Sequence, residues 1–504
     1  MSSEKPSQTE VEENLDITYD TNDSKSVSGF SPEERKKYLR KVDWRVLPIL
    51  AVTYLIQFYD KGLLGHAVLF GFSLDLGLMT ITLGSDGQVE ENNVKYANVS
   101  TVFYIFYIVG CYPMSYLAQK LGVKRMIPFL IFAWSIVILC TPACTNYAGI
   151  LVNRAFLGFL EAGVAPTFNT YMSRWWSRKE IASRSSIWYS SVGMASVISA
   201  MIDYGLSTMN ISNHLKHWMP MFFFTGSLGI VWSVVVFLFM PERPEEWHAL
   251  TDREKEALVM AHNESYLSST VPRISWSLFV SSFSEALTSF TTYSSSLLAF
   301  FGGVIGVALV NFLTLIVQGF GFSLLDTLAL TIPSGLLYLL GMLLAGYVCR
   351  KGNNLVYTVL MIADLTCLAG ALICWVGPRD NKGVLYFGAM LLSLQSVQIY
   401  IAYYMAAVNT MGHSKKIVIN AIVFAMAGAG NIAGAYIFAS TPGPEFRGGW
   451  IGSTVIIAAS FAVGLVSLIW YKMENSRRDK KGDQENPLTD DMTDKSCSSF
   501  RYFY

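Results

Sequence analysis

Residues 219–256 read MPMFFFTGSLGIVWSVVVFLFM followed by PERPEEWHALTDREKE, and this change from apolar to charged sequence decides the fold. The uncharged run 219–240 has a length that spans a bilayer, for which about 17–25 mostly apolar residues are needed. Residues 241–273 then hold 11 charged side chains. Similar apolar runs recur on both sides of this segment. The pattern therefore predicts two groups of membrane helices separated by a polar linker.

The composition excludes a soluble globular protein. The 504 residues are 52% apolar and 15% charged, whereas soluble domains are about 25% charged. Residues 1–45, 241–273 and 472–504 contain 18, 11 and 14 of the 74 charged side chains. The other 393 residues hold 31 charges, about 8%, which is too few to cover a surface that faces water. The formal net charge is zero, and no nucleic-acid partner is expected.

Twelve stretches along the chain are apolar and long enough to cross a bilayer. The run 286–317 exceeds the length of one untilted helix, so a re-entrant piece or a hinge at Gly302-Gly303 is expected there. The fold class predicted is an all-α membrane protein with twelve transmembrane helices in two six-helix halves. The expected spans are about 46–68, 96–117, 126–143, 148–171, 185–206, 219–240, 286–317, 328–349, 355–376, 384–408, 417–440 and 450–471.

The polar segments give the domain organisation and the orientation. The expected units are a disordered tail 1–45, a half 46–240, a linker 241–284, a half 285–472 and a disordered tail 473–504. A capping-box pattern at Thr251–Glu254 predicts that a short amphipathic helix starts in the linker. Eleven Lys and Arg side chains lie in the loops on the side of the tails, against five in the opposite loops. This asymmetry places both termini and the linker in the cytosol.

The motifs of common enzymes and metal sites are absent from the sequence. The seven cysteines form no CxxC pair, and the six histidines show no metal-binding spacing. There is no phosphate-binding loop of the Walker type, so ATP is not expected to supply energy. We therefore expect neither an enzyme nor a bound cofactor.

Charged side chains inside the spans are the candidate functional residues, because each costs about 2.5–3.5 kcal/mol at a helix centre unless it is paired or hydrated. Arg154 and Glu161 are seven residues apart on one helical face, roughly 10 Å along the axis, so they need partners elsewhere. Asp60 and Lys61 in the first span lie at a similar depth, and the four charges are expected to converge. The six candidates are Asp60, Lys61, Arg154, Glu161, Asp203 and Asp364.

The remaining polar residues within the spans are weaker candidates for a functional role. Asp364 is expected to be structural, and Asp203 to face water near the end of its span. Tyr54 and Gln57 extend the polar face of Lys61. In the second half, polar side chains either line a cavity or form hydrogen bonds between helices. The positions considered are Asn311, Gln395, Gln398, Asn420 and Asn431, of which Asn311, Gln398 and Asn420 are the candidates for substrate binding.

Several motifs resemble the fungal allantoate permease family, the anion:cation symporter branch of the major facilitator superfamily. The resemblance runs from about residue 42 to residue 472. The matching segments are DWRVLP (43–48), YLIQFYDK (54–61), FYIFYIVGCYP (103–113), NRAFLGFLEAGVAP (153–166), GFGFS (319–323) and GHSKK (412–416), followed by Asn420 and Gly430-Asn431.

The resemblance implies the major facilitator fold and proton-coupled uptake of a small organic anion across the plasma membrane of a fungal cell. By the same resemblance, the acids Asp60 and Glu161 handle the proton, and the bases Lys61 and Arg154 hold the anion. The implied partners are a carboxylate (allantoate, another ureido acid or a vitamin acid), protons and the lipid bilayer.

Other functions remain compatible with the residues. The chain could be a facilitator without proton coupling, a carrier of a zwitterion or cation, or a nutrient sensor of the same fold that does not transport. A monomer is expected, although the sequence does not specify the oligomeric state. Uptake measured with and without a proton uncoupler separates these alternatives.

Overall fold

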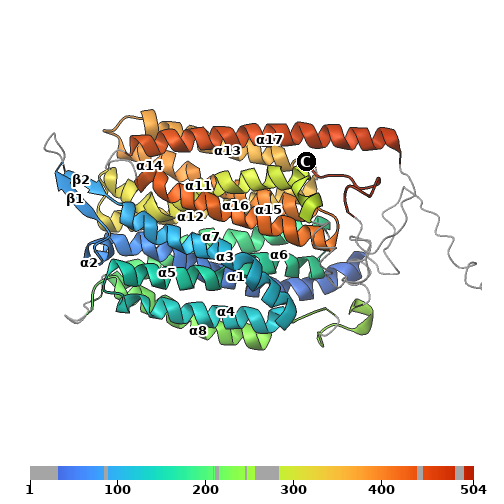
Figure 1. Cartoon of the computed structure of the whole chain (residues 1–504), viewed down its shortest axis with the longest axis horizontal. Helices are drawn as coiled ribbons and strands as arrows, with labels where there is room; N and C mark the ends of the chain where they lie inside the picture. The colour runs from blue at the N-terminus through green and yellow to red at the C-terminus, as the bar shows by residue number, and fades with distance from the viewer. Residues whose placement is uncertain are drawn as a thin grey trace, which may run out of the picture.

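The structure is a computed structural model of the chain that describes residues 32–83, 89–176, 178–207, 209, 215–244, 247–255, 283–352, 354–439, 446–482 and 493–504. Long helices run side by side along the longest axis of the molecule (Figure 1). The first group comprises α1 (Pro32–Leu69), α2 (Phe72–Asp75), α3 (Val94–Leu121), α4 (Val123–Leu139), η3 (Thr141–Ala143), α5 (Tyr147–Glu161), α6 (Val164–Trp175), α7 (Arg178–Ser207) and α8 (Met219–Phe239).

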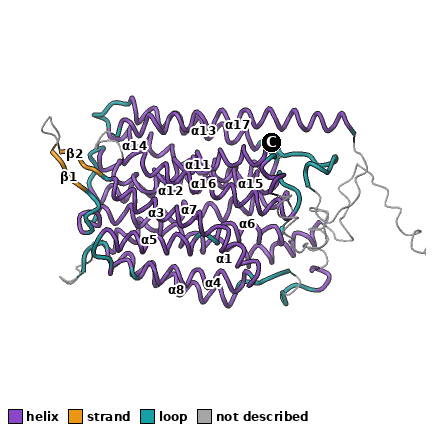
Figure 2. The backbone as a smooth tube through the Cα atoms, in the orientation of Figure 1, coloured by secondary structure: helices purple, strands orange, loops and turns teal. Residues whose placement is uncertain are grey.

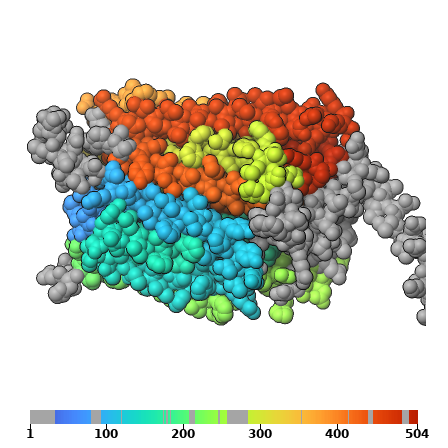
Figure 3. Space-filling model, viewed as in Figure 1, coloured from blue at the N-terminus to red at the C-terminus, as the bar shows by residue number. Residues whose placement is uncertain are grey.

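The second group follows the linker and packs against the first along the length of the molecule (Figure 3). It comprises α11 (Phe290–Gly319), α12 (Leu324–Lys351), α13 (Val356–Val376), α14 (Lys382–Leu391), η4 (Leu392–Gln395), α15 (Ser396–Val408), α16 (His413–Ala439) and α17 (Arg447–Lys481). We call the end of the bundle that carries the start of α1 and the end of α17 the linker end. The opposite end is the hairpin end.

Among the described residues, eleven helical segments are long and apolar enough to cross a membrane. The first helix, α1, is not among these eleven, since Gln57, Asp60 and Lys61 lower the hydropathy of its apolar stretch. With α1 the bundle has the twelve expected segments. Large apolar side chains such as Val231 and Leu238 of α8 are more than half exposed, as expected where lipid replaces water.

Two short strands at the hairpin end depart from the purely helical expectation. Strands β1 (Thr80–Leu83) and β2 (Val89–Asn92) pair antiparallel, with Thr80 opposite Asn92 and Leu83 opposite Val89 (Figure 2). The sequence TITL has three consecutive β-branched residues, which favour an extended strand.

The fourth span is broken where a single helix was expected. α5 ends at Glu161 and α6 starts at Val164. Pro166 accounts for the break, because its ring removes one backbone donor and clashes with the carbonyl of the residue four positions earlier, Ala162. The break places Glu161 at a helix end inside the bundle.

The seventh span shows the opposite difference, since the hinge expected at Gly302-Gly303 is absent. α11 is one continuous helix of 30 residues. The glycines instead allow neighbouring helices to approach closely. A Cβ on Gly303 would overlap the carbonyl oxygen of Ala427 on α16, and a Cβ on Gly302 would overlap Ile399 on α15.

The capping box expected in the linker has its two reciprocal hydrogen bonds. The backbone N–H of Thr251 donates to Glu254, and the backbone N–H of Glu254 donates to the Thr251 hydroxyl. Lys41 of α1 also forms an ion pair with Glu254 (2.8 Å). The rest of the expected amphipathic helix lies outside the described residues, as do most of the tail 1–45 and the segment 256–282.

The C-terminal tail differs from the expected disorder. α17 continues to Lys481, and residues 493–504, here called the C-terminal strap, pack against the linker end of the second half. Lys415, which is fully buried, forms ion pairs with Asp494 (2.6 Å) and Glu285 (3.0 Å). Asn409 exchanges two hydrogen bonds with the backbone of Phe503.

The strap is ordered because its backbone carbonyl groups accept hydrogen bonds from a side chain of the bundle. One guanidinium nitrogen of Arg478 on α17 contacts the carbonyl oxygens of Asp494, Cys497 and Phe500. Composition alone suggested disorder, since it does not show that a helical arginine lies beside these carbonyls.

We predict that Asp494→Asn weakens the attachment of the strap. The buried Lys415 ammonium would lose a charge-assisted bond, which contributes about 1.5–3 kcal/mol to stability. Thermal unfolding of the purified protein in detergent should show a lower apparent Tm. Asp479→Asn is the matched control, because Asp479 is 64% exposed in its ion pair with Arg501 and such pairs contribute less than about 1 kcal/mol. Equal Tm values for the two variants would contradict this role of Asp494.

Candidate functional site

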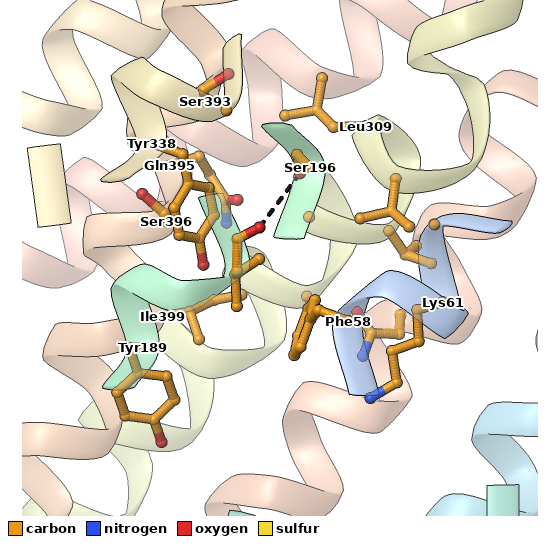
Figure 4. Close-up of a pocket in the computed structure, with 18 of the residues that line it drawn as sticks. Phe58, Lys61, Tyr189, Ser196, Leu309, Tyr338, Ser393, Gln395, Ser396 and Ile399 are labelled. Atoms are coloured by element: carbon orange, nitrogen blue, oxygen red, sulfur yellow. Dashed lines mark hydrogen bonds between the residues drawn. The ribbon is translucent and has the colours of Figure 1, made fainter. Parts of the chain in front are cut away.

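A cavity lies between the two halves near the middle of the bundle. The first half lines it with α1, α3, α6 and α7, and the second half with α11, α12, η4, α15 and α16. In Figure 4, Phe58 and Lys61 of α1 face residues such as Gln395, Ser396 and Ile399 of the second half. A site formed by both halves changes its shape whenever the halves move relative to each other.

Lys61 supplies a cation to this cavity. Its ammonium lies 3.2 Å from the carboxylate of Glu161, which is fully buried. The ammonium also lies over the aromatic rings of Phe58, Phe103 and Tyr107, at 4.7, 5.6 and 5.5 Å from the ring centroids. Among the described residues that line the cavity, Lys61 is the only one from the group Asp, Glu, Lys and Arg.

Glu161 is held by Gln57 as well as by Lys61. The side-chain amide of Gln57 donates to the Glu161 carboxylate (3.0 Å) and to the backbone carbonyl of Glu161 (3.2 Å). This carbonyl lies at the break between α5 and α6, and buried carbonyl groups require a donor. Gln57 is therefore buried beside the acid and does not line the cavity.

Asp60 and Arg154 complete a buried group of four charges. Asp60 interacts electrostatically with Glu161, Arg154 and Lys61. Neither of its oxygens accepts a hydrogen bond from a described donor, and Nε and Nη2 of Arg154 have no described acceptor. Neither side chain lines the cavity. The structure thus brings together the four expected residues, with Lys61 facing the cavity and Asp60 turned away from it.

The other candidate residues lie in different environments. Tyr54 lines the cavity and contacts Trp188 edge to face, with 4.6 Å between ring centroids. Gln398 donates to the carbonyl of Leu298 on α11, and Asn420 is buried outside the cavity lining. Gln398 therefore forms a contact between helices.

Asn311 belongs to a set of contacts that join the halves at the hairpin end. Its side chain donates to the Ser100 hydroxyl (2.8 Å), and its carbonyl accepts from Tyr96 (3.2 Å). Further contacts between the halves join Thr314 to the Gly65 carbonyl (3.0 Å) and Tyr436 to Asn98 (2.7 Å). The halves therefore meet at the hairpin end of the cavity.

Aromatic rings occupy the other side of the charged cluster. Tyr54 precedes Lys61 by seven residues, which places it about 10 Å nearer the linker end of α1. Tyr189 of α7 stacks on Tyr403 of α15 across the two halves, with 5.7 Å between centroids. The same helix α7 touches α12 through Gly193 and Gly335, where a Cβ on either glycine would overlap the carbonyl of the other.

The second half contributes a polar wall in which Gln395 was expected from the sequence and the two serines were not. η4 interrupts the tenth span and exposes Ser393, Gln395 and Ser396 to the cavity. The amide of Gln395 donates to the carbonyl of Gly302, while the Ser396 hydroxyl has no described partner. The sequence SLQS contains no proline or glycine that would have indicated this turn.

A second buried ionisable pair was not recognised from the sequence. Asp203 was expected to face water, but this expectation is wrong, because its side chain is fully buried between Tyr59 and His66. His66 lines the cavity. A histidine in the apolar stretch after Lys61 is itself an indication of function, but its partner is 137 residues away in sequence.

Comparisons with known proteins agree with the fold. The Major Facilitator Superfamily model matches residues 50–435. The chain is 29% identical to the uncharacterized transporter C460.05 of Schizosaccharomyces pombe, over 94% of this chain and 87% of that protein. It is 26% identical to the allantoate permease of Saccharomyces cerevisiae, again over 94% of this chain and 87% of that protein.

Two solved structures share the architecture at low sequence identity. The inward-facing, unoccupied form of a bacterial homologue of the human lysosomal transporter Spinster superposes with a TM-score of 0.59 and 15% identity, covering 87% of this chain and 98% of that chain. The human organic anion transporter MFSD10 (TETRAN) gives a TM-score of 0.57 and 14% identity, covering 84% and 99%. With twelve spans, a cavity between two halves and a family match over most of its length, this chain belongs to the Major Facilitator Superfamily.

Proposed function

We propose that this transporter carries a small organic anion into the cell together with protons. The observation that supports this most directly is the Lys61–Glu161 ion pair, in which the cation lines the cavity and the acid is buried behind it. A cation at the cavity wall gives a carboxylate substrate the counter-charge that replaces its lost hydration.

The proton acts on the acid of this pair. When Glu161 takes up a proton it loses its negative charge, and Lys61 is free to bind the substrate carboxylate. Asp60 is the second acid of the cluster and can hold the proton in turn. When Glu161 then releases the proton on the opposite side of the membrane, the Lys61–Glu161 ion pair forms again and the substrate is released.

Arg154 has a different role from Lys61 in this cycle. It is buried outside the cavity lining and interacts with Asp60 and Glu161. In the present arrangement it balances the acids, and it becomes a second anion-binding group when the halves rearrange. A guanidinium binds a carboxylate through two parallel hydrogen bonds, which a lysine cannot do.

Transport requires the cavity to open to each side in turn. In carriers of this architecture, a substrate site between the repeats is exposed alternately by rocking of one half against the other. The absence of side chains at Gly193 and Gly335 lets α7 and α12 touch directly where one half would rock against the other. We place the linker end in the cytosol, because the basic loops lie there, and the carrier in the plasma membrane as a monomer.

The substrate class is best tested by uptake in cells that express the chain. We expect accumulation of a labelled carboxylate, with allantoate, other ureido acids and vitamin acids as probes, and a loss of accumulation with a proton uncoupler. Uptake that survives the uncoupler would indicate a facilitator. Uptake of cations or zwitterions alone would contradict an anion site, and binding without uptake of any probe would indicate a sensor.

Glu161→Gln should abolish accumulation against a gradient. The amide resembles the protonated acid, so exchange of labelled for unlabelled anion across the membrane should persist. The two assays are run on the same vesicles, with Asp364→Asn as a matched control. Asp364 is a buried acid bonded to Ser460 outside the cavity. Normal proton-driven accumulation in Glu161→Gln would exclude this residue from the proton pathway.

Arg154→Lys should weaken anion binding more than Lys61→Arg does. The first change removes a two-point clamp but keeps the charge, while the second keeps both the charge and the position at the cavity wall. Binding is measured as substrate-induced thermal stabilisation of purified protein. If Arg154→Lys binds the anion as tightly as the wild type, Arg154 is a structural partner of Asp60.

A further inference from the structure

A second ionisable cluster lies nearer the hairpin end than the Lys61–Glu161 pair. Nδ1 of His66 lies 2.6 Å from one oxygen of Asp203, and the Tyr59 hydroxyl donates to the other oxygen (2.8 Å). Asp203 is fully buried, whereas His66 lines the cavity. The cluster therefore connects a buried carboxylate to the space in which the substrate is proposed to move.

The contacts of the cluster define which ring nitrogen can exchange a proton. With Asp203 ionised, its oxygens only accept hydrogen bonds, and the Nδ1 of His66 that faces them is the nitrogen that carries a hydrogen. In the neutral imidazole, Nε2 then holds the lone pair that can accept a proton. Imidazole gains and loses a proton more readily near neutral pH than the other common side chains.

The elements packed against α1 here add no competing charge. Helices α8 and α11 contain no Asp, Glu, Lys, Arg or His in their described sequences. On α7, Asp203 faces His66, and the other charged residues lie in its first two turns at the linker end. On α2, Asp75 is paired with Lys216 outside the cavity. On α1 itself, Lys61 is occupied by Glu161.

His66 is also adjacent to the contact that closes the hairpin end. The carbonyl of Gly65 accepts a hydrogen bond from Thr314 of the second half (3.0 Å). A Cβ on Gly65 would lie 2.8 Å from the carbonyl oxygen of Val310, so the backbones touch here. Opening of this contact would expose the His66 ring to water from the hairpin end.

We propose that His66, held by Asp203, is a proton-binding site at the outer end of the cavity. External water delivers a proton to Nε2, which converts the imidazole to imidazolium beside Asp203. The proton then leaves Nε2 through water in the cavity to the carboxylate of Glu161 or Asp60, and the ring returns to its neutral form. This inference rests on the proposed coupling of protons to anion uptake.

His66→Asn is the informative variant, since the Asn amide reproduces the Nδ1–H donor to Asp203 but does not titrate in this range. His217→Gln is the matched control, because His217 is exposed outside the cavity. In purified protein with ¹⁵N-labelled histidines, the signal missing in His66→Asn identifies His66. We expect this signal to change between its charged and neutral forms when the pH is varied. A signal that keeps one form throughout would overturn the proposal.

Transport provides the second readout, measured with the anion identified by the uptake panel. The ratio of uptake at low and high external pH should fall toward one in His66→Asn and stay at the wild-type value in His217→Gln. A wild-type ratio in His66→Asn would overturn the proposal, since a merely structural His66–Asp203 pair predicts that result. Proton-driven accumulation of the anion by Glu161→Gln would contradict the proposed function. If Glu161→Gln loses accumulation but His66→Asn keeps the wild-type pH ratio, only the outer proton site is contradicted.

Discussion

The Lys61–Glu161 ion pair is the interaction on which the rest of the site depends. Both charges lie inside a bilayer-spanning bundle, where an unpaired charge is costly. Glu161 is buried at the break between α5 and α6, and Lys61 keeps contact with the cavity. If one partner is neutralised, the charge of the other is left without a counter-charge and needs a new one. In the proposed cycle, this constraint links the protonation of an acid to the binding of an anion.

Helix packing positions this pair. Pro166 ends α5 near Glu161, and Gln57 satisfies the carbonyl that the break leaves free. Glycines bring the backbones together around the cavity, as at Gly193 and Gly335 between the halves. In the proposed symport, the number of protons sets the driving force. One proton with a monoanion moves no net charge, whereas two move one charge, which is worth about 2.3 kcal/mol per 100 mV of membrane potential.

The sequence predicted the twelve segments and the convergence of Asp60, Lys61, Arg154 and Glu161, because hydropathy and the rarity of charge in apolar spans are local properties. The sequence did not predict features that depend on a contact between residues far apart in the chain. The burial of Asp203 depends on His66 and Tyr59 from another helix, and the order of the strap depends on Arg478. The hinge expected in α11 failed for the same reason, since Gly302 and Gly303 serve neighbouring helices.

The most direct test of this account is proton movement driven by the anion itself. Purified protein in vesicles containing a pH-sensitive dye receives the anion outside, with no proton gradient imposed. If protons enter with the anion, the vesicle interior becomes acidic during uptake, and Glu161→Gln exchanges the anion without moving protons. Anion entry with no change of internal pH in the wild-type protein would contradict this account.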